Sequence, residues 1–203
     1  MASNLLVSLD EFQRRIDAVN ENWSQAEAES AERIIEGVSR KLEDICGRIF
    51  YSTGAATTRY FTAEAGNYLV VPDLISIDTD GLTTDEDGDR TYERTWATTD
   101  YDLWPYNASE FTEPYTELRT TPKGNYAFPT ISKGVKIVGN WGWSTTPPEI
   151  VEAVFLEASR IWQAAQSPSG VHESAELGQW IIQPQMHPAT VQLIAGYRRN
   201  LAR

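Results

Sequence analysis

The spacing of apolar residues divides the chain into helical ends and a strand-rich middle. Between residues 8 and 49, apolar side chains recur every three or four positions, which is the period of one helix face. A capping box, a serine followed three residues later by glutamate, stands at Ser8 and again at Ser24. We therefore expect a short helix after Ser8 and a longer one from Ser24 to about Cys46 or Arg48.

From Tyr51 the pattern changes to short segments rich in Thr, Tyr, Val and Ile, separated by Gly, Asp and Pro. This composition is typical of antiparallel strands. The segments are TTRYFTA, NYLVV, LISIDTD, RTYERTW, TDYDLW and, after a long gap, VKIVGNW. The gap, residues 105–133, holds four prolines and predicts a long loop with one short strand at about Glu117 to Thr120.

The last strand segment ends in Trp-Gly-Trp and is followed at once by helix-start signals. Thr146 can cap a helix, and Pro147 suits its first position because a missing N–H costs nothing there. We expect this helix to reach about Ala165. A Pro-Ser-Gly-rich linker at 167–170, an extended segment QWIIQPQ and a final helix from Pro188 to Leu201 complete the chain.

These elements predict an α+β protein, a small helical bundle with an inserted antiparallel β region and a C-terminal arm that ends in a helix. The expected parts are residues 1–50, the N-terminal helices of the body; 51–145, the β insertion with its long loop; 146–166, the third body helix; and 167–203, the arm. A hydrophobic fraction of 41% and seven Trp suffice for a packed core.

The net charge of −12 argues against a nucleic-acid groove, because DNA binding needs phosphates neutralised by Lys and Arg. Residues 51–145 hold 14 acidic and seven basic residues, whereas the chain beyond Glu176 has no acid and three Arg. A basic tail on an acidic body indicates an acidic partner. Cations that favour a helix C-terminus explain the tail equally well.

No motif for catalysis or metal binding stands out. The acidic stretch at 78–89 fails as an EF-hand, because its first ligand would be Thr83 and its twelfth Arg94, so we expect a solvated turn. His172 and His187 lack the spacing of zinc ligands, and Cys46 lies on an apolar helix stripe. We therefore expect no enzyme activity, no metal and no cofactor.

A carbohydrate-binding surface is the alternative function. Aromatic side chains stack on sugar rings, and the strand region is rich in them; the candidates are Trp104, Tyr106, Tyr115, Trp141 and Trp143. Burial in a core or at a protein interface accounts for such residues as well. A glycan-binding module should work as a monomer, whereas an assembly protein should self-associate.

A single cysteine allows no internal disulfide, which favours synthesis in a reducing cytoplasm. The first residues lack the basic start and long apolar run of a signal peptide. No apolar run approaches the roughly 20 residues that a membrane span needs. We expect no membrane association.

Several segments together resemble the head–tail connector (adaptor) proteins of long-tailed bacteriophages and gene-transfer agents. They are LEDICGRIFY, NYLVVPDLISIDT, YDLWPYN and VKIVGNWGWSTTPPEIVEAV, and the resemblance covers roughly residues 28–165. Its most specific part is the junction formed by Gly139, Trp141, Gly142, Pro147, Pro148, Ile150 and Ala153. The first helix and the arm lie outside it.

The resemblance implies a structural protein of the virion neck, made in the host cytoplasm. Such adaptors form a homo-oligomeric ring, usually of twelve subunits, beneath the portal, extend the DNA ejection channel and bind the next neck or tail-completion protein. An acidic channel lining would repel the passing duplex, although the acidity also aids solubility. A different phage tail or baseplate module is the alternative within this class.

Two sets of residues are candidates for assembly. The corner formed by Trp141, Gly142, Trp143, Pro147 and Pro148 would fix the angle between the β insertion and the body, or be a buried corner with no part in assembly. The C-terminal helix would contact the portal through Val191, Ile194, Tyr197, Arg198, Arg199, Leu201 and Arg203. The alternative for this helix is that it folds back on its own domain.

Overall fold

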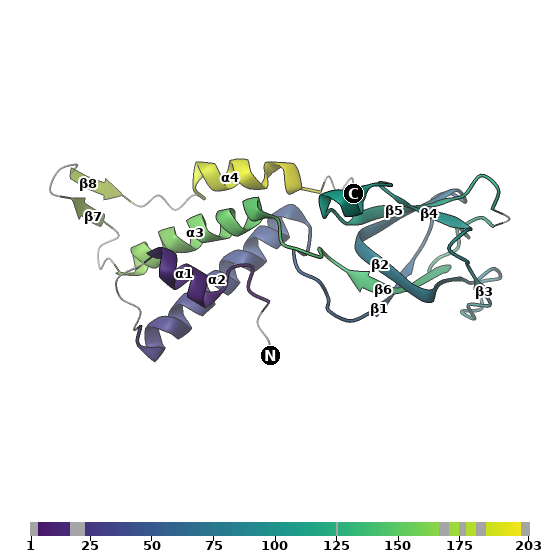
Figure 1. Cartoon of the computed structure of the whole chain (residues 1–203), viewed down its shortest axis with the longest axis horizontal. Helices are drawn as coiled ribbons and strands as arrows, with labels where there is room; N and C mark the ends of the chain where they lie inside the picture. The colour runs from purple at the N-terminus through teal and green to yellow at the C-terminus, as the bar shows by residue number, and fades with distance from the viewer. Residues whose placement is uncertain are drawn as a thin grey trace. The chain divides into compact units, whose positions relative to one another are not determined.

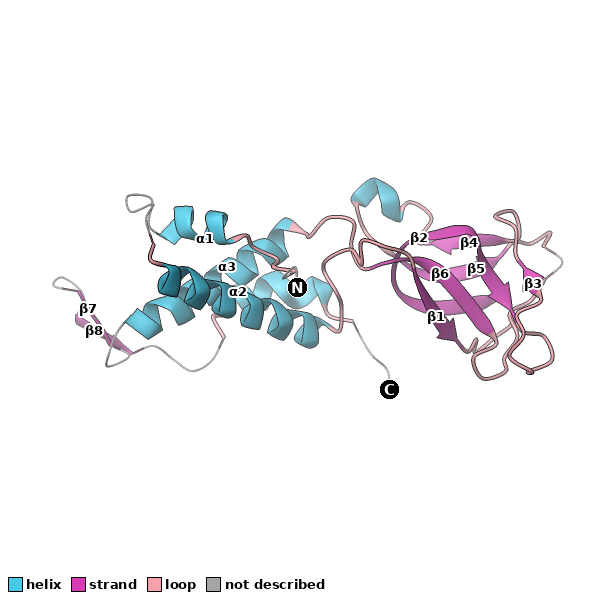
Figure 2. Ribbon diagram, turned by 90° about the horizontal axis from the view of Figure 1, so that it is seen from below, coloured by secondary structure: helices cyan, strands magenta, loops and turns pink. Residues whose placement is uncertain are grey.

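The computed structural model describes residues 4–16, 23–124, 126–166 and 186–199, and the backbone alone of residues 171–174 and 178–181. The chain forms two compact units, one of residues 1–48 with 146–203 and the other of residues 49–145. The first is helical and the second is built on a β-sheet (Figures 1 and 2). The predicted α+β class is confirmed.

Among the described residues of the first unit there are four helices, and α3 lies against both α2 and α4 (Figure 1). The elements are α1 (Leu9–Ile16), α2 (Gln25–Cys46), α3 (Pro148–Gln166), α4 (Pro188–Ile194) and the 3₁₀ turn η2 (Ala195–Tyr197). A two-stranded antiparallel hairpin, β7 (Val171–Ser174) and β8 (Gly178–Ile181), lies between α3 and α4 in the sequence. Residues 179–181 of the predicted extended segment belong to β8, and residues 182–185 lie outside the described residues.

Local capping explains where the long helices begin. At α2 the predicted capping box is present, since the Ser24 hydroxyl accepts from the Glu27 N–H at 3.3 Å and the Glu27 carboxylate accepts from the Ser24 N–H at 2.8 Å. At α3 the Pro147 carbonyl accepts from the Val151 N–H at 3.1 Å. Pro148 therefore takes the first helical position, one residue later than predicted.

An aromatic cluster holds the short helix α1 in place. Phe12 is fully buried, and its ring meets Trp23, Phe155 and Trp162 edge-on at centroid distances of 6.3, 5.8 and 6.4 Å. Trp23 and Trp162 stack at 4.7 Å. An isolated eight-residue helix is marginal in water, so this packing is what stabilises α1.

The second unit is an antiparallel sheet with strand order β1-β6-β2-β5-β4, and β3 pairs with the far end of β2 (Figure 2). The strands are β1 (Thr57–Phe61), β2 (Tyr68–Thr84), β3 (Arg94–Thr95), β4 (Tyr101–Trp104), β5 (Tyr115–Thr120) and β6 (Val135–Trp141), with the 3₁₀ turn η1 (Ala108–Phe111) between β4 and β5. The predicted strand within the long loop is β5.

Strand β2 is longer than the sequence pattern indicated. NYLVV and LISIDTD, predicted as two segments, form one strand whose register is irregular between Val70 and Leu74. Pro72 lies in this interval, and its missing N–H is accommodated where ladder pairing is interrupted. The first part of β2 pairs with β5 and the later part with β6, so the sheet splits beyond Leu74.

Candidate assembly surfaces

The Trp-Gly-Trp corner is a buried junction within the β unit. Trp141 is completely buried, and its indole N–H donates to the Thr57 carbonyl at 3.0 Å. The Arg59 guanidinium lies 4.4 Å from the centre of its ring. Burial of the Arg59 side chain lowers the pKa of its guanidinium from the ordinary value. Trp143 is also buried and donates its indole N–H to the Asp73 carboxylate at 3.2 Å.

Gly142 permits a close backbone approach at this corner. Its φ of 97° lies in the region that favours glycine, and an added Cβ would collide with the Tyr51 carbonyl oxygen. The Gly142 N–H donates to the Asp73 carbonyl at 2.8 Å, and the Thr53 N–H donates to the Trp141 carbonyl at 2.9 Å. The corner therefore ties the first residues of the β unit to its last strand.

The two prolines of the predicted corner lie in a different unit from its two tryptophans. Pro147 and Pro148 belong to the helical unit, where they open α3. Trp141, Gly142 and Trp143 belong to the β unit, so the structure divides the predicted set between the two units. In the β unit the entering segment at Tyr51 and the leaving segment at Gly142 lie in contact, which fixes where the chain enters and leaves that unit.

The C-terminal helix packs on its own domain. Ile194 is fully buried, the Tyr197 hydroxyl donates to the Glu149 carboxylate at 2.9 Å, and the Arg199 N–H donates to the Cys46 carbonyl at 2.8 Å. Val191 and Arg198 are exposed. Leu201 and Arg203 lie outside the described residues. The regular helix also ends at Ile194, earlier than the predicted Leu201.

A buried carboxylate joins α3 to the start of α4. Glu157 is fully buried; it accepts from Arg160 at 2.5 Å and from the His187 N–H at 3.3 Å. Burial alone would raise the pKa of Glu157, but the bonds from Arg160 and His187 outweigh burial, so the pKa is lowered. The charged form therefore stabilises the packed arm. Sequence patterns gave no sign of this contact.

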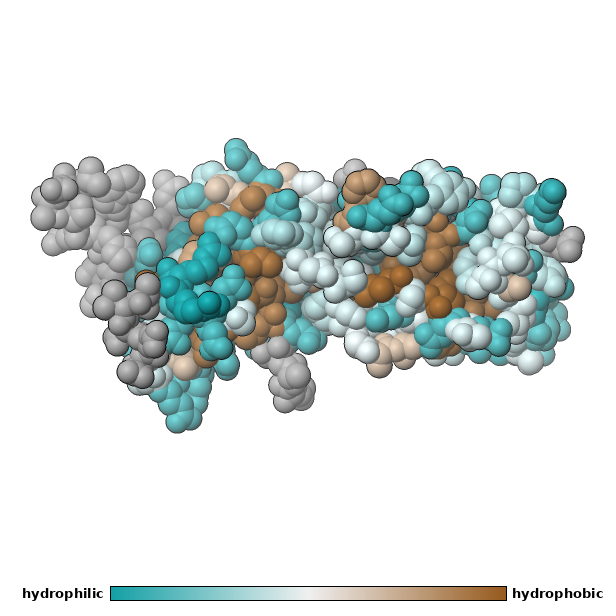
Figure 3. Space-filling view, viewed as in Figure 1, coloured by the Kyte–Doolittle hydropathy of each residue, from teal (hydrophilic) through white to brown (hydrophobic). Residues whose placement is uncertain are grey.

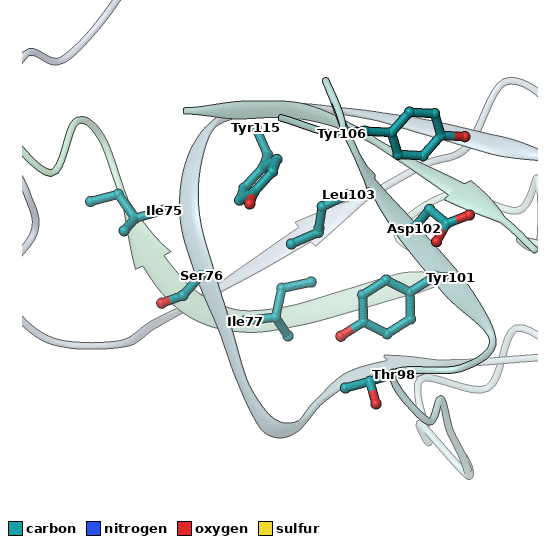
Figure 4. Close-up of a pocket in the computed structure, with 9 residues that line it drawn as sticks. All are labelled: Ile75, Ser76, Ile77, Thr98, Tyr101, Asp102, Leu103, Tyr106 and Tyr115. Carbon is teal, nitrogen blue, oxygen red and sulfur yellow. The ribbon is translucent and has the colours of Figure 1, made fainter. Parts of the chain in front are cut away.

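An open groove crosses the β unit where the sheet splits (Figure 4). Its volume is about 520 Å³, and β2, β4, β5 and the segments flanking β4 supply its walls. The lining residues are Ile75, Ser76, Ile77, Thr98, Tyr101, Asp102, Leu103, Tyr106 and Tyr115. No sequence pattern indicates this groove, because it depends on which strands are neighbours in the sheet.

The acidic turn and Cys46 are among the positions that the sequence raised as candidates for metal binding or catalysis. Asp85, Asp87 and Asp89 place carboxylate oxygens within 4.8 Å of one another, but Asp85 already accepts from the Gly88 and Arg90 N–H groups at 2.7 and 2.9 Å, as a turn requires. Burial raises the pKa of the Cys46 thiol, which makes it a poorer nucleophile.

The aromatic residues proposed as a sugar platform do not form one surface. Trp141 and Trp143 are buried, whereas Tyr106 is 57% exposed. Arg119 covers the ring of Trp104, with its guanidinium 4.0 Å from the ring centre. Of the five candidates, Tyr106 and Tyr115 line the groove. Among the described residues no helix is long and apolar enough to cross a bilayer.

Comparison with solved structures finds this fold in a gene transfer agent particle. A chain of the structure described as "Neck of empty GTA particle computed with C6 symmetry" aligns with a TM-score of 0.59 and 16% identity, over 100% of this chain and 96% of its own length. This chain therefore shares its fold with a chain of that structure. A chain of "Virion of native gene transfer agent (GTA) particle" aligns with a TM-score of 0.55 and 14% identity, over 98% of this chain and 93% of its own.

The shared fold includes parts that the sequence resemblance did not cover. Coverage of the full chain takes in the first helix and the C-terminal arm, which lie outside residues 28–165. At these identities the likeness is one of fold. No family model matches the sequence, and no curated protein matches it.

Proposed function

We propose that this protein is a structural component of the virion neck that forms a ring adaptor between the portal and the next neck or tail-completion protein. The observation that carries the proposal is the fold match along the whole chain to a chain of a neck determined with C6 symmetry. The adaptor-like motifs around the Trp-Gly-Trp corner support it independently. In this role the ring extends the channel through which DNA leaves the head.

A closed ring needs two unlike surfaces on each subunit, because a head-to-tail contact closes only when one patch fits another. The C6 symmetry of the similar neck structure suits rings of six or twelve subunits alike. We retain twelve as the proposed number. The corner at Trp141, Gly142 and Trp143, with Pro147 and Pro148 opening α3, is proposed to set the direction in which each subunit presents its β unit.

The C-terminal arm is proposed as the portal contact, now with a narrower surface. Ile194 already packs on its own domain, so the free subunit can offer Val191 and Arg198, which are exposed, together with the sequence beyond Arg199. Arg198, Arg199 and Arg203 add positive charge that would speed association with an acidic portal surface. The acidic remainder of the chain suits a channel wall that does not retain DNA.

A catalytic role has little support in the described residues. Cys46 is buried with a raised thiol pKa, and His187 uses its Nδ1 atom to accept from the Ala189 N–H at 3.2 Å. Glycan binding remains the second candidate, on the exposed Tyr106 and Phe111. A glycan-binding module would bind sugar as a monomer, which glycan arrays and sedimentation can establish.

Self-association tests the proposal directly. Native mass spectrometry of the purified chain, alone and with the portal of the same virus, should detect a closed oligomer that binds the portal in a fixed ratio. A chain that stays monomeric in both samples, up to the highest soluble concentration, would rule out the ring adaptor.

A further inference from the structure

Strand β4 is an open edge of the sheet. It pairs with β5 on one side, and no other described strand pairs with it. The hydrogen-bonding direction of its backbone follows from the Thr121 N–H, which donates to the Asp100 carbonyl at 3.1 Å. Hydrogen-bonded pairs recur at every second residue, so Asp102 and Trp104 bond β5 while Tyr101 and Leu103 turn their N–H and C=O groups outward.

An open edge of this kind is a template for another strand. No described group bonds the outward N–H and C=O groups of Tyr101 and Leu103. The groove lies beside them, and its lining is mixed: Ile75, Ile77 and Leu103 are apolar, whereas Ser76, Thr98 and Asp102 are polar (Figure 4). Brown, hydrophobic surface is visible on the β unit in Figure 3. The edge supplies hydrogen bonds and the groove supplies room for side chains.

The helical unit contains a strand pair that belongs to no larger sheet among the described residues. Strands β7 and β8 form a hairpin that is a separate two-stranded sheet, and such a hairpin alone is marginally stable in water. Each of its strands is four residues long, as is β4. Adding the hairpin to a larger sheet would satisfy the open edges of both.

Charge and composition favour β8 as the strand that docks. Its sequence, GQWI, has no charged residue and includes the apolar Trp180 and Ile181. β7, with the sequence VHES, carries the acidic Glu173, and the receiving strand β4 carries the acidic Asp102. Like charges disfavour the pairing of two strands, so β7 is the poorer partner.

We propose that β8 of a neighbouring copy adds to the free edge of β4 and that this contact closes the ring. The inference rests on the proposed ring function, because a head-to-tail ring needs two unlike surfaces on one chain. The edge groove of the β unit and the hairpin of the helical unit are such a pair. Each subunit then gives a strand to one neighbour and receives a strand from the other.

A photo-crosslink from the groove identifies what occupies it. Tyr106, which lines the groove and is 57% exposed, is replaced by benzoylphenylalanine, and the full-length chain is assembled from a mixture of unlabelled and ¹⁵N-labelled copies. After irradiation, mass spectrometry should find links to residues 171–181 that join labelled with unlabelled copies. Tyr60, on the opposite edge strand β1 and 50% exposed, is the matched control and should not capture the hairpin.

A second variant tests the backbone contact. Leu103→Pro removes an outward N–H and leaves the bonds of Asp102 and Trp104 to β5 in place, a change that edge strands tolerate. We expect the yield of the crosslink to fall about fivefold, the effect of one lost backbone hydrogen bond. Circular dichroism of this variant should show an intact sheet. An intact sheet with an unchanged crosslink yield would overturn the strand contact.

The outcomes separate this inference from the ring proposal. A ring in which Tyr106 captures another segment, the same copy, the portal or nothing overturns the docking of β8 and leaves the ring adaptor standing. Failure to form any ring, with or without the portal, overturns both.

Discussion

Substitution of Gly142 by alanine should destabilise the β unit far more than the same substitution at another glycine with positive φ. At Gly142 the new Cβ would collide with the backbone at Tyr51, whose carbonyl carbon would be 3.0 Å away. Gly54 has a φ of 73°, and nothing lies within 4 Å of a Cβ added there. An alanine at either position has the unfavourable positive φ, but only at Gly142 does the added Cβ collide with the backbone of Tyr51.

The size of the effect follows from the contacts at the corner. The positive φ alone costs an alanine about 1–2 kcal/mol at either site. Moving Tyr51 away from Gly142 would also break the bonds from the Thr53 and Trp143 N–H groups, which contribute about 1 kcal/mol each. We expect Gly142→Ala to lose about 3–4 kcal/mol of unfolding free energy and Gly54→Ala about 1–2 kcal/mol.

Urea unfolding followed by far-ultraviolet circular dichroism measures both variants against the natural chain. The midpoint for Gly142→Ala should lie clearly below that for Gly54→Ala, with similar slopes. Equal midpoints would show that the Tyr51 backbone can move away from residue 142 with little loss of unfolding free energy. The corner would then not fix where the chain enters and leaves the β unit.

Four further predictions concern other parts of the molecule. Trp141→Ala should cost about 3–5 kcal/mol in urea unfolding, as a fully buried aromatic does, and a loss under 1 kcal/mol would contradict its core position. The pKa of Glu157 is lowered in the folded chain, so its contribution to stability is complete above the unfolded-state pKa of about 4.3. This contribution is lost as the pH falls through the folded-state pKa. Thermal melts at several pH values should show that Glu157→Gln removes this acid-dependent loss of stability. Truncation after Gly170 should lower the melting temperature of the helical unit, because it removes Ile194 from the core, and an unchanged temperature would mean that the arm is not packed there. Elemental analysis of dialysed protein should find no stoichiometric zinc or calcium, and either metal at one per chain would refute the expectation of a metal-free protein.

Features set by neighbouring residues were predictable from the sequence. The capping box fixed the start of α2 at Ser24, and the alternation of VKIVGNW marked β6. The motifs around Gly142 also located the corner, although its collision partner Tyr51 lies far away in the sequence. A local pattern shows that a glycine is needed without showing what approaches it.

Features set by distant pairing were not predictable. Pro72 suggested a break, but the pairing of β2 with β5 and then with β6 carries one strand across it. The open edge of β4 and its groove follow from the strand order, which no single segment encodes. The role of Trp23 likewise depends on Trp162, which reaches it from another helix.

The binding partner of the C-terminal helix was likewise not predictable from local sequence alone. The apolar stripe of Val191, Ile194 and Tyr197 indicated a helix that needs a partner, which its own domain, a neighbouring subunit or the portal could supply. The buried Ile194 and the bond from Tyr197 to Glu149 show that its own domain is one of them. Contact with a portal therefore has to use the residues that this packing leaves exposed.

Electron microscopy of the protein mixed with the portal of the same virus tests whether the chain forms a ring on the portal. Class averages should show a ring of twelve copies of this protein on the portal axis, around an open channel. Averages that show the portal alone, with this protein remaining as single copies, would contradict the proposed ring.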